Sequence, residues 1–162
     1  MHAFLVSFLS LLLVVVLSPS CSKENSTATS SWSVQLKISG GFTGRGNGNL
    51  WLTSDGKFKY EPPAPPNTPG KACEGKLSSE ELKPIVEAVK KSQPKQWNRP
   101  ELKVSAPDAF SYELEFRNEA KAEPVSVLWY DNTIDKLPAD LKRLSDALRQ
   151  AMHTAAAKCP NQ

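Results

Sequence analysis

The sequence predicts an α+β fold in which an antiparallel sheet of about five strands carries two helices on one face. Apolar residues alternate with polar ones in two stretches, 32–39 and 109–117, which is typical of strands that are buried on one side. Apolar residues at helical spacing follow each set of strands, at 82–89 and 141–152. Because strands and then a helix occur twice, one sheet with both helices on the same face is the economical arrangement.

The first set of strands begins at Trp32, where four apolar residues alternate with polar ones as far as Ser39. Two shorter strands are expected at 50–53 and 57–61. The Asp55-Gly56 pair between them is a typical hairpin signal. These segments therefore predict a meander.

The first helix is expected after a proline-rich connection at 62–69, where the prolines exclude regular structure. Ser78 and Glu81 have the spacing of a capping box, and apolar residues from 82 to 89 continue at helical spacing. Pro84 lies deeper than the first turn. We therefore expect the helix to begin with a tight turn or to bend there.

A second hairpin is predicted from the strands 109–117 and 125–130, joined by the polar turn 118–123. The last helix is expected to start near Pro138 and to run toward Ala157. Its apolar stripe consists of Leu141, Leu144, Leu148 and Met152.

The N-terminus has the pattern of an export signal. Phe4 to Leu17 contains fourteen residues with only two polar ones, which is shorter than the ~18 that a membrane-spanning helix needs. We therefore predict a cleaved signal peptide at 1–20, a flexible tether at 21–31, and a single folded domain at 32–159.

Cys21 leaves two processing routes open. Lipidation of this cysteine would give a membrane-anchored lipoprotein of the cell envelope, and we favour it because a polar tether follows the cysteine. Ordinary cleavage after Ser20 would instead give a soluble periplasmic or secreted protein.

Cys73 and Cys159 form a natural disulfide pair if Cys21 carries lipid, because exported proteins meet an oxidising environment. Such a bridge would contribute about 4 kcal/mol in the chain-entropy model. The alternative is two free thiols.

The charge and the sparse reactive residues disfavour several function classes. A formal net charge of +3 is too small to indicate nucleic-acid binding. His153 is the single histidine after the signal, and the two remaining cysteines lack zinc-ligand spacing, so we predict no metal, no cofactor and no catalytic site. Glu113 and Glu115 share a strand face about 7 Å apart, which a glycosidase pair could use. We favour a solvent-exposed strand face instead, because no neighbour in the sequence would raise the pKa of one carboxyl group.

The glycine-rich run 40–48 contains five of the eight glycines of the chain. It lacks the spacing of a dinucleotide-binding loop, and a strand rather than a helix follows it. Glycines allow positive φ, so the run could present an exposed aromatic and an arginine to a protein partner. The predicted partner-binding residues are Gly40, Gly41, Phe42, Thr43, Gly44 and Arg45. In the alternative interpretation, Phe42 turns inward and caps the core.

Three motifs in order, SGGFTG, PDAFSYELEF and DNTIDKLPADLKRLSDAL, resemble the emfourin family of small α+β proteins, and the resemblance extends from 34 to 148. The family takes its name from an inhibitor of a thermolysin-like zinc metalloprotease. The resemblance therefore implies a domain that blocks the cleft of a secreted or periplasmic metalloprotease without catalysis or cofactor of its own. The matching positions are Gly40, Gly41, Phe42, Gly44, Asp108, Phe110, Tyr112, Leu137 and Pro138. The alternative is a structural or adaptor lipoprotein of the envelope with a non-protease partner.

Overall fold

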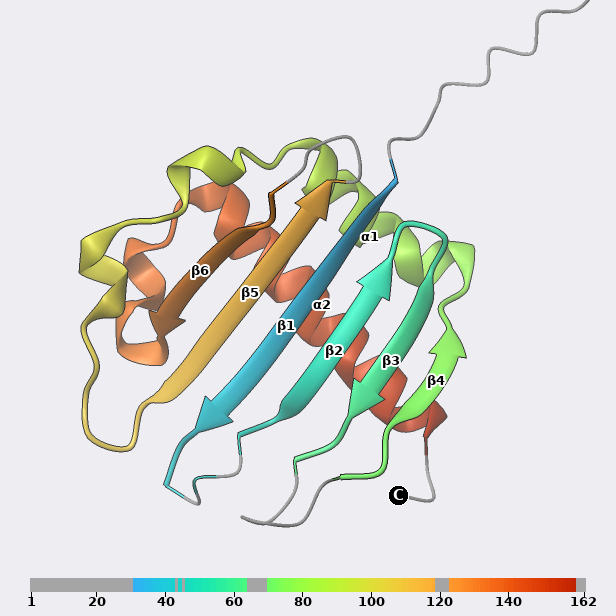
Figure 1. The fold of residues 1–162 in the computed structure, drawn as a ribbon, viewed down its shortest axis with the longest axis horizontal. Coiled ribbons are helices and arrows are strands. Elements are labelled where there is room, and N and C mark those ends of the chain that lie inside the picture. Colours follow the sequence, from blue (N-terminus) through green and yellow to red (C-terminus); the bar gives the residue numbers. More distant parts are fainter. Residues whose placement is uncertain (1–30, 43, 45, 64–69, 119–122, 160–162) are drawn as a thin grey trace, which may run out of the picture.

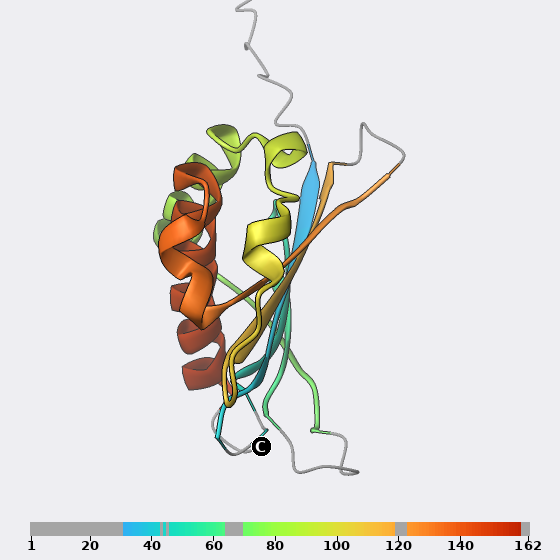
Figure 2. The same ribbon diagram turned by 90° about the vertical axis from the view of Figure 1, so that its left-hand side faces the viewer.

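The computed structural model describes residues 31–159 except 43, 45, 64–69 and 119–122. These residues form one six-stranded antiparallel sheet in the order β4-β3-β2-β1-β5-β6, with two α-helices on the same face (Figures 1 and 2). The strands are β1 (Trp32–Gly40), β2 (Gly48–Thr53), β3 (Lys57–Glu61), β4 (Cys73–Lys76), β5 (Phe110–Asn118) and β6 (Val125–Tyr130), and the helices are α1 (Ser79–Lys90) and α2 (Ala139–Lys158). Three 3₁₀ turns complete the fold: η1 (Pro94–Gln96), η2 (Pro100–Lys103) and η3 (Asp131–Lys136). The predicted α+β class is confirmed, with one strand more than expected.

β4 is the strand that the sequence did not indicate. Its four residues, Cys-Glu-Gly-Lys, include no run of alternating apolar side chains. It exists because it pairs with β3, where Phe58 lies opposite Gly75 and Tyr60 lies opposite Cys73. The ring of Phe58 occupies the space that a side chain at Gly75 would need.

The centre of the sheet is the pairing of β1 with β5, which joins the predicted meander to the predicted second hairpin. The register places Leu36 opposite Leu114 and Val34 opposite Phe116, and all four side chains are buried. This pairing links segments almost eighty residues apart, with Lys37 and Glu113 separated by 76 positions. Periodicity along the chain gives no information about such a long-range choice of partner.

The core lies between the sheet and the helices. The predicted stripe of α2 is buried, and Leu141, Leu144 and Leu148 have no exposed surface. Burial of each leucine side chain contributes about 1.5–3 kcal/mol. α1 packs beside α2 and contributes Ile85 and Ala88 to the same core.

The predicted capping box at the start of α1 is confirmed. The backbone N–H of Glu81 donates to the Ser78 hydroxyl at 3.3 Å, and the Ser78 N–H donates to the Glu81 carboxylate at 2.6 Å. Both bonds satisfy backbone donors that have no partner inside the helix. Pro84 lies inside the helix, which continues through it as a single element to Lys90.

The predicted disulfide between Cys73 and Cys159 is present, with 6.2 Å between the two Cα atoms. It joins β4 to the residue that follows α2 and closes a loop with a sequence separation of 86 residues. The chain-entropy model gives a contribution of about 4–5 kcal/mol for a loop of this length.

The connection between α1 and β5 is packed against the start of α2. Trp97 has no exposed surface, and its indole N–H donates to the Asp140 carboxylate at 2.8 Å. The backbone N–H of Gln93 donates to the same oxygen at 2.7 Å. Partial burial by itself raises the pKa of Asp140. The hydrogen bonds to its carboxylate have the larger effect, so the pKa lies below its ordinary value. Asp140 therefore fastens this connection to the start of α2.

The face of the sheet opposite the helices is polar. Gln35 donates to Asn49 at 3.1 Å, and the Lys59 ammonium lies 5.0 Å from the centre of the Trp51 ring. Lys37 pairs with Glu113 at 3.4 Å. This face therefore meets solvent, as expected for the polar side of alternating strands.

No helix in the described part of the chain has both the length and the apolar character that crossing a membrane would require.

Candidate protein-binding surface

The loop between β1 and β2 is held at its base by the backbone. Asn47 N–H donates to the Ile38 carbonyl at 3.1 Å, and Gly46 N–H donates to the Gly40 carbonyl at 3.0 Å. The Gly41 carbonyl accepts from Gly44 N–H at 2.8 Å. These bonds fix where the loop leaves the sheet.

Two of the glycines explain why the run is rich in this residue. Gly41 has φ of 74°, and a Cβ on it would lie 2.5 Å from the ring of Phe110. Gly46 has φ of 63°, and a Cβ there would overlap the backbone of Ile38 and Ser39. Both positions therefore exclude larger residues for reasons of conformation and of space.

Phe42 points into solvent with 91% of its surface exposed. The interpretation in which this residue turns inward and caps the core is therefore wrong. Phe110 does pack against the core and covers Gly41. Thr43 and Arg45, the remaining predicted contact residues besides the glycines, lie outside the described residues.

A hollow of about 170 Å³ lies between the base of this loop and the C-terminal half of α2. Ile38 and Tyr60 line it from the sheet, and Arg149, Met152 and His153 line it from the helix. Burial raises the pKa of Tyr60, whose hydroxyl donates to the Asn47 carbonyl at 3.4 Å. This hollow was not predicted from the sequence, although Arg149, Met152 and His153 are spaced so that they lie on neighbouring positions of one helix face.

The other positions of the family resemblance have structural roles. Asp108 adopts φ of 59° in the turn before β5. Tyr112 is buried and stacks on Trp129, with 5.3 Å between the ring centres. Leu137 is buried, and Pro138 immediately precedes α2. Packing and chain geometry account for these four residues.

The two strand carboxylates, Glu113 and Glu115, lie on the open face of the sheet. Glu113 accepts from the Lys37 ammonium at 3.4 Å, and Glu115 accepts from the Arg117 guanidinium at 2.6 Å. Each carboxylate thus has a basic neighbour, and the Glu113 and Lys37 side chains are about half exposed. Such surface ion pairs contribute little to stability.

His153, the single histidine after the predicted signal, is exposed on α2 and lines the hollow described above. Among the residues that the structure describes, no three histidine, cysteine or acidic side chains are grouped so that they could hold a metal ion. Cys21, the predicted lipidation site, lies outside the described residues.

No protein-family model matches the chain, and no curated protein matches it at a significant level.

Proposed function

We propose that this chain is an exported binding protein whose loop at 40–48 inserts Phe42 into an apolar subsite of a thermolysin-like zinc metalloprotease and thereby inhibits it. The observation that carries the proposal is the 91% exposure of Phe42 on a loop whose base is fixed by backbone hydrogen bonds. An exposed aromatic side chain on a constrained loop loses little conformational freedom on binding, which favours affinity. The motif resemblance supplies the class of partner.

The proposal also includes anchoring of the chain to the membrane through lipid on Cys21. The observation that supports this part of the proposal is the position of Cys21, four residues after the apolar stretch Phe4 to Leu17. Mass spectrometry of the exported protein should find Cys21 as the first residue with an added acyl mass. A different N-terminus without acyl mass would return the protein to the soluble periplasmic or secreted class.

The inhibition test is a titration of a panel of thermolysin-like proteases, including any encoded by the same organism, with the protein as purified from expressing cells. Phe42→Ala should weaken inhibition by roughly thirtyfold or more, because an aromatic anchor at the centre of an interface is worth about 2 kcal/mol or more. Val104→Ala is the matched control, since Val104 is the other large apolar side chain exposed in the described residues, at 54%. It should leave inhibition unchanged.

Absence of inhibition across the panel would sink the proposal. If the unaltered protein captured a non-protease envelope protein and Phe42→Ala did not, that result would support the adaptor function instead. Turnover of a substrate that is lost in Glu113→Gln or Glu115→Gln would contradict both and indicate an enzyme.

A further inference from the structure

β6 is the outer strand on one side of the sheet, and half of its residues direct their backbone away from the sheet. In an antiparallel strand, every second residue points its N–H and its carbonyl toward the same neighbour. Tyr130 N–H donates to the Thr133 hydroxyl at 3.2 Å, and the Tyr130 carbonyl accepts from the same hydroxyl at 2.8 Å. Tyr130 therefore points away from β5, and Ser126 and Leu128 share its orientation.

The registers of the inner strands give the same result. In β1 the carbonyls of Trp32 and Ile38 accept hydrogen bonds from the β2 side, at 2.9 and 3.1 Å. Even-numbered residues of β1 thus face β2, and odd-numbered residues face β5. Carried through the two registers, this directs the odd-numbered residues of β6 toward β5 and the even-numbered ones outward. The backbone groups of Ser126 and Leu128 have no hydrogen-bond partner among the described loops.

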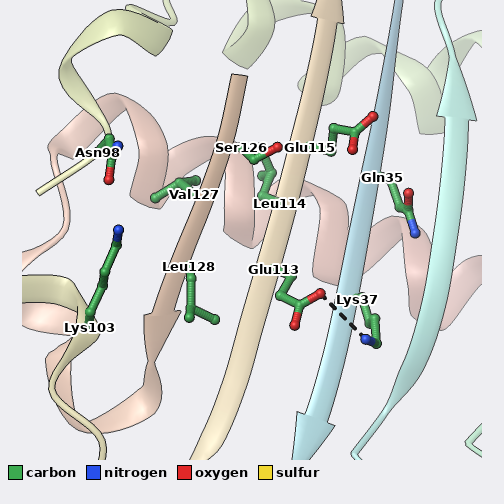
Figure 3. A pocket seen from close by; sticks show the side chains of 10 residues that line it. All are labelled: Gln35, Lys37, Asn98, Lys103, Glu113, Leu114, Glu115, Ser126, Val127 and Leu128. Atoms are coloured by element: carbon green, nitrogen blue, oxygen red, sulfur yellow. Dashed lines mark hydrogen bonds and ion pairs between the residues drawn. The ribbon is translucent and has the colours of Figure 1, made fainter. Parts of the chain in front are cut away.

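A groove of about 390 Å³ lies beside these two residues (Figure 3). Asn98 and Lys103, from the connection before β5, lie across the groove from β6. η2 packs next to β6 on the side of the core, where Leu102 is buried and its carbonyl accepts from the Thr133 hydroxyl at 3.2 Å. The groove is therefore open toward the polar face of the sheet.

The charges around the groove are unequally matched. Two carboxylates line the groove on the polar face, and each has a basic partner: Glu113 pairs with Lys37, and Glu115 pairs with Arg117. Lys103 is exposed and makes no ion pair with any residue that the structure describes. The outer wall of the groove thus offers a cation that an acidic ligand would complement.

We propose that the edge of β6 binds an extended peptide segment of another protein, which adds as a further strand and places an acidic side chain beside Lys103. Ser126 and Leu128 supply two donors and two acceptors for the incoming backbone, which is the basis of recognition by strand addition. The site uses neither Phe42 nor the glycine-rich loop, so it is independent of the proposed function. A second copy of this chain fits less well, because a twofold contact would bring two Lys103 side chains to one interface.

The test uses two synthetic eight-residue peptides of alternating threonine and valine, capped at both ends, with glutamate or lysine at one central threonine position. Each is titrated into the ¹⁵N-labelled protein as purified from expressing cells, with detergent to disperse any lipid. The glutamate peptide should shift the amide signals of Ser126 and Leu128 and slow their hydrogen exchange. The lysine peptide should bind more weakly.

Two variants test the two parts of the site separately. Ser126→Pro removes an outward N–H, which an edge strand tolerates, and should abolish binding while the other amide signals keep their positions. Lys103→Ala should weaken the glutamate peptide about two- to fivefold, as expected for an exposed ion pair, and should strengthen the lysine peptide, because it removes a like charge. If Ser126→Pro fails to fold, the Lys103→Ala result alone decides.

Absence of shifts at Ser126 and Leu128 at millimolar peptide would overturn the proposal. It would also be overturned if the Lys103→Ala variant bound each peptide with the same affinity as the unaltered protein. Without peptide, the hydrogen-exchange protection of these two amides could also rise with protein concentration. That result would overturn the proposal, because it would show a second copy of the chain bound at the edge.

Discussion

The two outer strands of the sheet end it in different ways. β4 has four residues, and the disulfide from Cys73 fastens it to the end of α2. The Lys158 ammonium donates to the Lys76 carbonyl at 3.2 Å and to the Glu81 carboxylate at 2.7 Å, so it covers part of this edge. β6 has six residues, and a groove lined by the exposed Lys103 lies beside its outward backbone groups. Exposed strand edges invite pairing, and proteins usually shorten or cover them. The difference indicates that β4 is protected, while β6 is available for binding.

The disulfide should have the largest effect on stability. The double variant Cys73→Ser, Cys159→Ser should lose about 4 kcal/mol of unfolding free energy, because the unfolded chain regains the entropy of an open loop. The measurement is the urea midpoint of the double variant and of the unaltered protein with and without reductant. Reductant should lower the midpoint of the unaltered protein alone; equal midpoints for all samples would show that the bridge contributes nothing.

Asp140 should have the next largest effect, because it positions the connection that lies beside β6. Asp140→Asn should cost about 1–3 kcal/mol, since the Trp97 indole and the Gln93 N–H lose a charged acceptor. Asp146→Asn on the same helix is the matched control; its carboxylate is exposed and lies 4.0 Å from Arg149. Thermal unfolding followed by near-ultraviolet circular dichroism should separate the two variants, and equal effects would contradict this role.

The same carboxylate should make stability depend on pH. The pKa of Asp140 is lower in the folded protein than its ordinary value of 3.8. Its contribution is therefore complete above about pH 4 and is lost as the pH falls through the folded pKa. The difference in unfolding free energy between Asp140→Asn and the unaltered protein should shrink as the pH falls from 5 toward 2; a difference that stays constant would be inconsistent with the lowered pKa.

Lys158 should have the smallest effect on stability. Lys158→Met removes the ion pair with Glu81 and the hydrogen bond to Lys76, but both partners are near solvent, so the thermal midpoint should fall less than in Asp140→Asn. Lys142→Met, at another exposed position of α2, is the matched control and should leave the midpoint unchanged. A loss as large as that of Asp140→Asn would mean that the cover on the β4 edge is more important than its exposure indicates.

Local patterns in the sequence predicted most of the fold. Alternation located β1 and β5, the Ser78 box located the start of α1, and the cysteine count paired Cys73 with Cys159. The first two signals involve only a few neighbouring residues. The disulfide was predicted because two cysteines remain once Cys21 is assigned to lipid.

The missing parts depend on contacts that are distant in sequence. β4 is defined by its partner strand rather than by its own side chains, and the burial of Trp97 depends on Asp140, 43 residues further along the chain. The candidate loop was located by its glycines, but only the structure decided that Phe42 points outward. The sequence did not predict that β6 has an exposed edge, because this depends on the order of the strands in the sheet.

Amide hydrogen exchange along β6 tests the central claim about the two edges most directly. The exchange rates of Ser126 and Leu128 should be close to those of an unfolded peptide, while Val127 and Trp129, which face β5, should be strongly protected. The measurement is made on the free protein at two concentrations, with the Gly75 amide of β4, which faces β3, as a protected internal comparison. Alternating fast and slow exchange along β6 would establish the open edge. Uniform protection of all four β6 amides at both concentrations would contradict it.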